Sequence, residues 1–339
     1  MKKILVTGGL GYIGSITCLH LYNQGFNPII VDNLSNSSLD ALERIQEIIG
    51  NKIEFLHVDL AETSACKKLE SIDFESVIHF AAKKSVEESI DKPTIYYRNN
   101  IASLINVLEI CQIKSVQNFI FSSSCTVYGN TNNYPVGENE VFGKSTSAYA
   151  TSKQICENII EEFSNLNALK CVSLRYFNPI GAYINANLGE YPSEHSRNIL
   201  PILDMVANGF IKSFQIFGND YNTRDGTGIR DYIDINDLAL GHIKALEYLR
   251  SYNGEEHFQA FNLGSGSGTT VKEIIEAYEK VNNVKINTSF SPRRPGDLQE
   301  IYADISKAVN LLKWKPTVSI EDSLRTSYLW SNKYTDDYS

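Results

Sequence analysis

The chain has 339 residues, 42% of them hydrophobic and 21% charged, which is the composition of a globular protein large enough for two domains. Its net charge of −9 argues against nucleic acid as the main partner, and no apolar segment approaches the roughly 18 residues that a membrane span needs. The six cysteines are dispersed and the six histidines form no ligand-like cluster, so we expect free thiols, no metal site and a cytoplasmic protein.

The N-terminus has the pattern of a strand, a glycine-rich turn and a helix. An apolar run at residues 3–6 enters the turn at residues 7–14, and a helical pattern then continues to Gly25. Glycines allow the backbone of such a turn to approach a pyrophosphate, and the N–H groups at the helix start bind its negative charge. We therefore expect this turn to bind a dinucleotide through Gly8, Gly11, Tyr12, Ile13 and Gly14.

A second apolar run, residues 28–31, ends at Asp32, the 18th position after Gly14. A carboxylate at this place accepts hydrogen bonds from both ribose hydroxyls of an adenosine and repels a 2′-phosphate, so NAD is favoured over NADP. A glycine-rich turn without a ligand is the alternative, and the order of strand, turn, helix and acid disfavours it.

Strands and helices continue to alternate through the first half of the chain. We expect strands at residues 53–58, 76–82, 117–121 and 170–175, and helices at residues 94–110 and 149–163. This alternation predicts a Rossmann-type, doubly wound parallel sheet, whose ligands lie beyond the carboxyl ends of the strands. The residues at those ends should line one crevice: Gly14, Asp32, Asp59, Phe80, Ala81, Ala82 and Ser124.

The pattern loosens after residue 177, where turns become frequent and helices and strands short. We expect an NAD-binding domain at residues 1–177, to which a segment at about 229–263 returns, and a smaller C-terminal α/β substrate lobe at residues 178–339. The glycine-rich residues 264–268 are more consistent with a strand-to-helix turn than with a phosphate loop, and residues 331–339 with a frayed tail.

Tyr149 and Lys153 are four residues apart in a helical pattern, so their side chains lie on one face of the helix. A free phenol has a pKa of about 10, and an ammonium group beside it favours the phenolate and lowers that pKa. Such a pair can act as a base at neutral pH. The alternative is the surface of an ordinary amphipathic helix.

Several stretches of the chain resemble the extended short-chain dehydrogenase/reductase family and, within it, the 4-epimerases of UDP-hexoses. They are residues 7–14, 121–124, 127–129, 149–153, 174–179, 216–221 and 228–232, and the similarity extends over residues 3–330. The resemblance implies an isomerase that oxidises C4 of a UDP-hexose with tightly bound NAD and reduces it on the other face, interconverting UDP-glucose and UDP-galactose. It also implies a homodimer formed through the helices near residues 94–110 and 151–163.

The resemblance implies roles for individual residues. Tyr149 would take the proton of the sugar's 4-hydroxyl, Lys153 would hold the nicotinamide ribose and lower the pKa of the phenol, and Ser124 would hydrogen-bond the 4-oxygen. Besides Ser124 and Tyr149, the substrate would contact Asn178, Asn198, Phe217, Arg230, Arg294, Asp297 and Ile301, with the two arginines on the diphosphate. Besides the glycine turn, Asp32 and the catalytic set, the cofactor would contact Asn33, Asn36, Ser37, Asp59, Leu60, Phe80, Ala81, Ala82, Lys84, Asn99 and Phe177.

Three positions depart from the family pattern. Lys83 stands where an apolar residue is usual, Glu87 replaces a common glycine, and Ile301 occupies the position that governs sugar size. A UDP-N-acetylglucosamine/UDP-N-acetylgalactosamine 4-epimerase is therefore an alternative. A nucleotide-sugar 4,6-dehydratase is disfavoured because Ser124 is followed by Cys125 and a threonine rather than by acidic residues. A net oxidoreductase that releases NADH and a non-catalytic nucleotide-binding protein are further alternatives.

Overall fold

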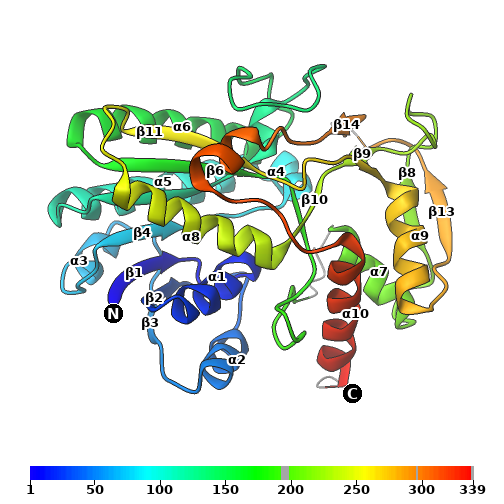
Figure 1. The fold of residues 1–339 in the computed structure, drawn as a ribbon, viewed down its shortest axis with the longest axis horizontal. Coiled ribbons are helices and arrows are strands. Elements are labelled where there is room, and N and C mark those ends of the chain that lie inside the picture. The colour runs from blue at the N-terminus through cyan, green and yellow to red at the C-terminus, as the bar shows by residue number, and fades with distance from the viewer. Residues whose placement is uncertain (192–197, 295–296, 337–339) are drawn as a thin grey trace.

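The computed structural model describes residues 1–191, 198–294 and 297–336, and in this part of the chain a seven-stranded parallel sheet is covered by helices on both faces (Figure 1). The strands, in sheet order, are β11 (Phe258–Leu263), β6 (Lys170–Tyr176), β5 (Asn118–Ser124), β4 (Ser76–His79), β1 (Lys2–Thr7), β2 (Phe26–Asp32) and β3 (Glu54–His57). This order reverses beside β1, as in doubly wound sheets. The predicted Rossmann-type fold is confirmed.

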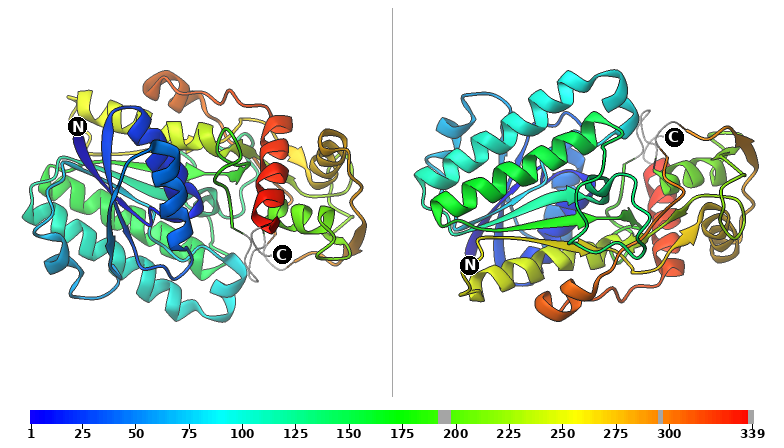
Figure 2. Two further views of the ribbon diagram at one scale, coloured as in Figure 1. Left: turned by 90° about the horizontal axis from the view of Figure 1, so that it is seen from below. Right: turned by 90° about the horizontal axis from the view of Figure 1, so that it is seen from above.

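Side chains that alternate along the strands enter two separate cores, because the sheet is buried on both faces. Ile4 and Val6 of β1 join one core, and Leu5 joins the other. The first core is covered by α1 (Tyr12–Asn23), α2 (Leu39–Ile49) and α8 (Ile235–Ser251). The second is covered by α3 (Ala65–Leu69), α5 (Pro93–Ile113) and α6 (Ala148–Asn167), and Figure 2 shows the two layers from both sides.

The edge strand β11 comes from late in the chain. It pairs in parallel with β6, from Phe258 beside Cys171 to Leu263 beside Tyr176. The preceding helix α8 begins at a cap in which the Asp234 side chain accepts a hydrogen bond from a backbone N–H, and it packs against α1. Residues 258–263 thus lie in the sheet and α8 covers one of its faces. The predicted division into domains, with residues 1–177 joined by a segment at about 229–263, stays a prediction.

A second lobe lies at the right of Figure 1 and has its own core. Leu203, Ile216, Tyr278 and Leu324 meet there. The lobe is built from α7 (Ile199–Ala207), β8 (Phe214–Phe217), α9 (Val271–Asn282), β13 (Thr288–Ser291) and α10 (Ile320–Asp336), with β8 and β13 paired in parallel. Short strands connect the lobe to the sheet: β7 (Asn178–Ile180), β9 (Ile229–Arg230), β10 (Tyr232–Asp234), β12 (Thr269–Thr270) and β14 (Glu300–Ile301).

The remaining short elements are α4 (Val86–Asp91), the 3₁₀ turn η1 (Cys125–Tyr128) and the π-helix η2 (Ala308–Leu312). Residues 264–268 join β11 to β12 directly before α9, so the predicted strand-to-helix connection is confirmed. The predicted frayed tail is wrong for residues 331–336, because α10 continues to Asp336, while residues 337–339 lie outside the described residues.

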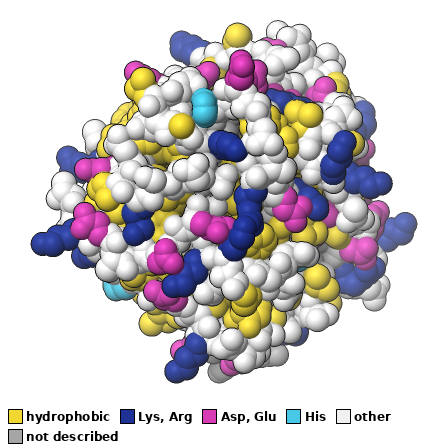
Figure 3. Space-filling model, turned by 60° about the vertical axis from the view of Figure 1, so that its left-hand side comes forward, with side chains coloured by type: hydrophobic (Ala, Val, Ile, Leu, Met, Phe, Trp, Pro, Cys, Tyr) yellow, Lys and Arg dark blue, Asp and Glu magenta, His cyan; other side chains and the backbone are white. Residues whose placement is uncertain are grey.

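Lys and Arg side chains are interspersed with Asp and Glu on the face drawn in Figure 3, so charge of one sign is not gathered there. Across the described residues, no helix combines the length and the apolar character that crossing a membrane requires. The six cysteines are unpaired, four of them buried and two half-buried.

Candidate active site

Two glycines of the turn after β1 lie too close to the backbone to carry a side chain. Gly8 has a φ of +66°, and a Cβ atom on it would lie 2.7 Å from the backbone nitrogen of Ala81. A Cβ atom on Gly14 would lie 2.3 Å from the carbonyl oxygen of Gly8. Among the described residues, no side chain caps the N-terminus of α1, where Gly11, Tyr12 and Ile13 lie. The backbone N–H groups at this helix start therefore form a cradle for a pyrophosphate.

Asp32 ends β2 beside this turn. One carboxylate oxygen accepts a hydrogen bond from the Leu10 N–H (3.1 Å), and the other accepts from the Leu34 N–H (2.9 Å) and the Ser37 hydroxyl (2.8 Å). The turn and the loop after β2 are thus tied to one buried acid, and the recognition of an adenosine ribose by this acid stays a prediction.

The loops after β2 and β3 are joined by Asn33, whose side-chain amide donates to Asp59 (3.1 Å). Asn36 is exposed on the first of these loops. Leu60 is buried in the second core, so its side chain does not line the crevice, and its carbonyl oxygen accepts from Asn106 (2.8 Å). The structure therefore brings Asn33 and Asp59 together with Asp32 but leaves the contacts of Asn36 and Leu60 as predictions.

Residues that follow β4 lie against the glycine turn. The Phe80 N–H donates to the Thr7 carbonyl oxygen (2.9 Å), and the Ala81 N–H donates to the Thr7 hydroxyl (3.4 Å). The contact of Ala82 with the cofactor stays a prediction. The ammonium of Lys84 reaches the second lobe, where it pairs with Glu190 (2.8 Å). Asn99 is half-buried on α5.

The predicted catalytic residues converge at the carboxyl end of β5. Ser124 is the last residue of that strand, and α6 begins directly before Tyr149 because the Ser147 hydroxyl caps its N-terminus. The Lys153 ammonium donates to the Ser122 carbonyl oxygen (2.5 Å) and lies 5.9 Å from the centroid of the Tyr149 ring. A serine, a phenol and an amine thus share one site.

Burial raises the pKa of Tyr149 to about 12, and a hydrogen bond with Ser124 acts in the opposite direction. Burial also lowers the pKa of Lys153 to about 8. Because the Lys153 ammonium is bonded to the Ser122 carbonyl, the group that favours the phenolate most directly here is Ser124. The predicted influence of Lys153 on the phenol stays a prediction.

A cavity of about 990 Å³ opens between the sheet and the second lobe, a volume suited to a nucleotide-sized ligand. Most of the predicted substrate residues line it: Asn178, Asn198, Phe217, Arg230, Arg294 and Asp297. Its wall also contains Tyr12, Glu87 and Glu190, which were not predicted as substrate residues. Glu87 could have been singled out from the sequence, because it departs from the family pattern. Nothing in the sequence pointed to Glu190.

The two arginines of the cavity share one carboxylate. Arg294 donates through Nε to Asp297 (3.0 Å) and stacks its guanidinium 4.6 Å from the centroid of the Phe217 ring. Arg230 lies 3.9 Å from the other oxygen of Asp297. The Asn198 amide donates to Glu190 (2.8 Å), which also holds Lys84. Two guanidinium groups beside an aromatic face can bind a diphosphate and a base.

The catalytic set lies near this cavity, because Ser124 pairs in register with Tyr176, and Asn178, two residues further along the chain, lines the cavity. Burial raises the pKa of Cys125, the residue after Ser124, to about 12, and the charge of Arg230 acts against that rise. Ser124 and Tyr149 themselves do not belong to the residues that line the cavity.

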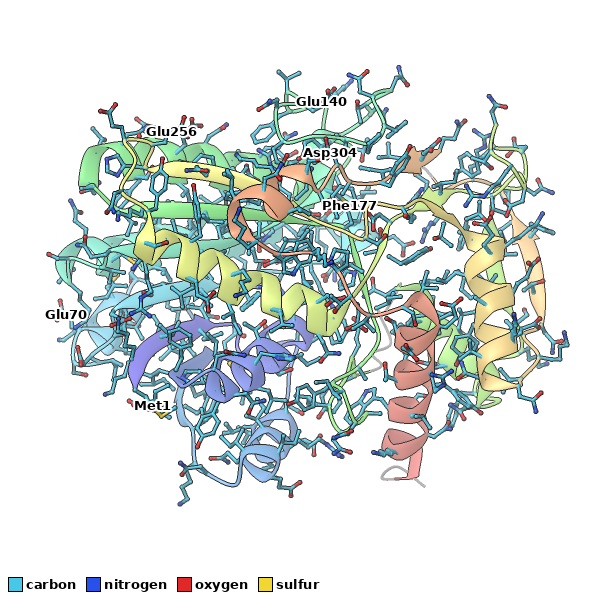
Figure 4. The ribbon with its side chains drawn as sticks, in the orientation of Figure 1. Met1, Glu70, Glu140, Phe177, Glu256 and Asp304 are labelled. Atoms are coloured by element: carbon cyan, nitrogen blue, oxygen red, sulfur yellow. The ribbon has the colours of Figure 1, made fainter. Side chains whose placement is uncertain are left out.

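Ile301 is buried in a small core with Val127, Tyr128 and Phe177, rather than in the cavity wall. Phe177, labelled in Figure 4, lies where the sheet meets the second lobe. Ile301 also pairs with Arg230 across β14 and β9. An effect of Ile301 on sugar size would therefore act through these neighbours, and its role stays a prediction.

Behind the catalytic set, Arg175 of β6 forms a buried ion pair with Glu157 of α6 (2.8 Å). Glu157 also accepts from the Ser123 hydroxyl, and Arg175 donates to the Tyr128 hydroxyl (3.1 Å). Glu157 is one helical turn beyond Lys153, so this pair fixes α6 against β5 and β6. In the described part of the chain, no three His, Cys, Asp or Glu side chains gather as a metal site requires.

Comparisons with known proteins find the same architecture. The family model described as GDP-mannose 4,6 dehydratase matches residues 5–327. The chain is 40% identical over 337 residues to the UDP-glucose 4-epimerase of Pasteurella multocida (strain Pm70), and the match covers 99% of both chains.

Two solved structures are close to this fold. The UDP-glucose-4-epimerase of Stenotrophomonas maltophila with bound NAD and formylated UDP-arabinopyranose has a TM-score of 0.95 at 37% identity, covering 99% of this chain and 100% of that one. The UDP-glucose 4-epimerase of Bifidobacterium longum in complex with NAD+ and UDP has a TM-score of 0.94 at 39% identity, covering 99% of each.

Proposed function

The chain belongs to the UDP-glucose 4-epimerase family, and from this premise we propose that it interconverts UDP-glucose and UDP-galactose by reversible oxidation at C4, with tightly bound NAD. The observation that carries the proposal is the position of Ser124, Tyr149 and Lys153 around the end of β5, beside the strand β6 that leads into an arginine-bearing cavity. Net chemistry is isomerisation, and galactose metabolism is the setting that this reaction suggests.

The residues of the crevice fit NAD. Gly8 and Gly14 let the turn fold tightly against its own backbone, and no side chain caps the helix start that follows, so a pyrophosphate can approach the backbone N–H groups there. Asp32 would accept from the ribose hydroxyls. When bound, NAD supplies a hydride acceptor that later returns the hydride to the opposite face of the sugar. Lys153 would hold the nicotinamide ribose.

The residues of the chain move one proton. Tyr149 takes the proton of the sugar's 4-hydroxyl as C4 is oxidised and returns it when the 4-keto sugar is reduced. Because burial raises the pKa of this phenol to about 12, the base needs partners that favour its phenolate. Ser124 supplies a hydrogen bond, and Lys153 supplies positive charge on the same helix face.

The cavity retains the nucleotide while the sugar turns. Arg230 and Arg294 would bind the diphosphate, Phe217 would pack near the uracil, Asp297 would contact the nucleoside, and Asn178 and Asn198 would contact the sugar-phosphate region. Tight contacts on UDP and looser contacts on the hexose allow the 4-keto sugar to present either face without leaving.

The alternatives are less favoured. The curated relative from Pasteurella multocida and the two solved structures above, which match nearly the whole chain, are named UDP-glucose 4-epimerases, so an enzyme dedicated to N-acetylated UDP-hexoses is not the first choice. The matched family model is named for a 4,6-dehydratase, but Cys125 and Thr126 follow Ser124 here, and neither can protonate a leaving 6-hydroxyl as a carboxylic acid does.

The test begins with the wild-type protein and UDP-galactose, with UDP-N-acetylgalactosamine as a separate substrate and chromatography of the products. UDP-glucose should form, without accumulation of the absorbance of reduced nicotinamide. The Tyr149→Phe variant should fold, retain NAD and lose about two to four orders of magnitude in turnover, since one proton transfer loses its catalyst. Near wild-type turnover in that variant would refute Tyr149 as the base.

We also propose a cytoplasmic homodimer. Ile95, Ile105 and Ile113 of α5 and Leu166 of α6 are exposed apolar side chains on helices that pack side by side, and a second copy would cover them. The unpaired thiols suit a reducing compartment. Sedimentation as a monomer would contradict the dimer.

A further inference from the structure

Glu87 lines the cavity and contacts one of its two arginines. It lies in the first turn of α4, which follows β4 of the sheet, and its carboxylate is 3.5 Å from a terminal nitrogen of Arg294 in the second lobe. Both side chains line the cavity, and both remain partly exposed, 44% for Glu87 and 34% for Arg294. The pair therefore connects the two walls between which a ligand must enter.

This contact neutralises the place where a diphosphate would bind. Arg230 and Arg294 face two carboxylates, those of Asp297 and Glu87. A diphosphate therefore gains a net positive site only if one carboxylate withdraws. Asp297 is bound to the segment of Arg294, because its N–H donates to the Arg294 carbonyl oxygen (3.2 Å) and its carboxylate pairs with the Arg294 side chain. Glu87 comes from α4 on the opposite wall, and its side chain is the more exposed of the Glu87–Arg294 pair.

We propose that Glu87 is an internal competitor of the diphosphate: it occupies Arg294 in the ligand-free protein and gives it up when a nucleoside diphosphate binds. The inference rests on the proposed function. It assigns a role to a residue that stands where the family commonly has glycine, which has no side chain to compete. The consequence is weaker binding of UDP and UDP-hexoses and faster release of product than the arginines alone would give.

The effect is modest because the pair is partly exposed. Exposed ion pairs contribute little, so removal of the Glu87 charge should tighten UDP binding about two- to fivefold. The difference should shrink as salt is added, since screening weakens the Glu87–Arg294 attraction.

The experiment is calorimetric titration of UDP into the NAD-loaded protein, for the wild type and for Glu87→Gln. Asp91→Asn is the matched control, because Asp91 is exposed at the end of the same helix and its substitution removes the same charge. The Kd for UDP should fall about two- to fivefold in Glu87→Gln and stay at the wild-type value in Asp91→Asn. An unchanged Kd in Glu87→Gln, or an equal gain in Asp91→Asn, would overturn the inference.

A double-mutant cycle with Arg294→Ala tests whether the gain passes through Arg294. Glu87→Gln should improve UDP binding in the wild-type background and leave it unchanged when Arg294 is absent. An equal improvement in both backgrounds would mean that the charge of Glu87 acts at long range and not through Arg294. That result would overturn this inference and leave the proposed function standing. If the wild type bound no UDP at all, the proposed function would fall, and this inference with it.

Discussion

Asp204 allows a prediction of how the stability of the folded protein depends on pH. It is a buried carboxyl of α7 in the cavity wall, and it accepts hydrogen bonds from the hydroxyls of Tyr278 and Ser327 (2.8 Å for Ser327). Burial raises its pKa from 3.8 to about 7, and the two hydrogen bonds act against this rise without cancelling it.

The raised pKa fixes the sign of a pH effect on stability. Between pH 3.8 and pH 7 the folded protein binds a proton at Asp204 that the unfolded chain has already released. The free energy of unfolding therefore falls as the pH rises through this window. A difference of about three pH units, at about 1.4 kcal/mol each, gives an upper bound of about 4 kcal/mol. For a chain of this length, that energy corresponds to about 6 °C in Tm.

The Asp204→Asn substitution should remove this dependence, because the amide has nearly the same shape and cannot ionise. We expect the Tm of the wild type, measured relative to that of the variant by circular dichroism, to fall by up to about 6 °C between pH 4 and pH 8. Asp91→Asn, at an exposed position, is the control. If the difference in Tm between the wild type and Asp204→Asn stayed the same from pH 4 to pH 8, the reasoning would be refuted.

Two further predictions concern the dinucleotide cradle. Asp32→Ala removes the acceptor of the Leu10 N–H and of the ribose hydroxyls, so the NAD content of the purified protein should drop, and an unchanged content would argue against the ribose role. Gly14→Ala forces a Cβ atom to within 2.3 Å of a carbonyl oxygen, so NAD should be lost and unfolding should become easier by about 1–3 kcal/mol. Gly137→Ala, whose nearest atom would be 4.0 Å away, is the control, and equal losses in both variants would contradict the steric explanation.

Local patterns in the sequence were sufficient for the sheet and for the residues at its strand ends. Gly14, Asp32 and Ser124 each follow or end a periodic apolar run, and parallel strands bring their carboxyl ends together. The same kind of pattern gave a wrong prediction for the end of α10, because the polar residues after Trp330 were interpreted as a frayed tail. Trp330 is buried and donates to the Glu190 carbonyl oxygen, so a tertiary contact holds the helix there.

The charged cavity wall could not be predicted in this way. Glu87 and Glu190 come within reach of Arg294 and Lys84 only because the second lobe packs against the loop after β4. Such contacts depend on how distant segments are placed, and no spacing in the sequence records them. For the same reason, the sequence predicted that Lys153 accompanies Tyr149 but not that its ammonium binds the Ser122 carbonyl.

The position of β11 limits how the chain can be truncated or recombined with the chain of a relative. A fragment that ends at Phe177 would lack β11 and α8. Strand β6 would become an unpaired sheet edge, and the apolar face of α1 that packs against α8 would be exposed to water. Neither half can therefore be excised by a single truncation. A graft that transfers the sugar preference of a relative must carry two separate segments, one before and one after residues 235–263.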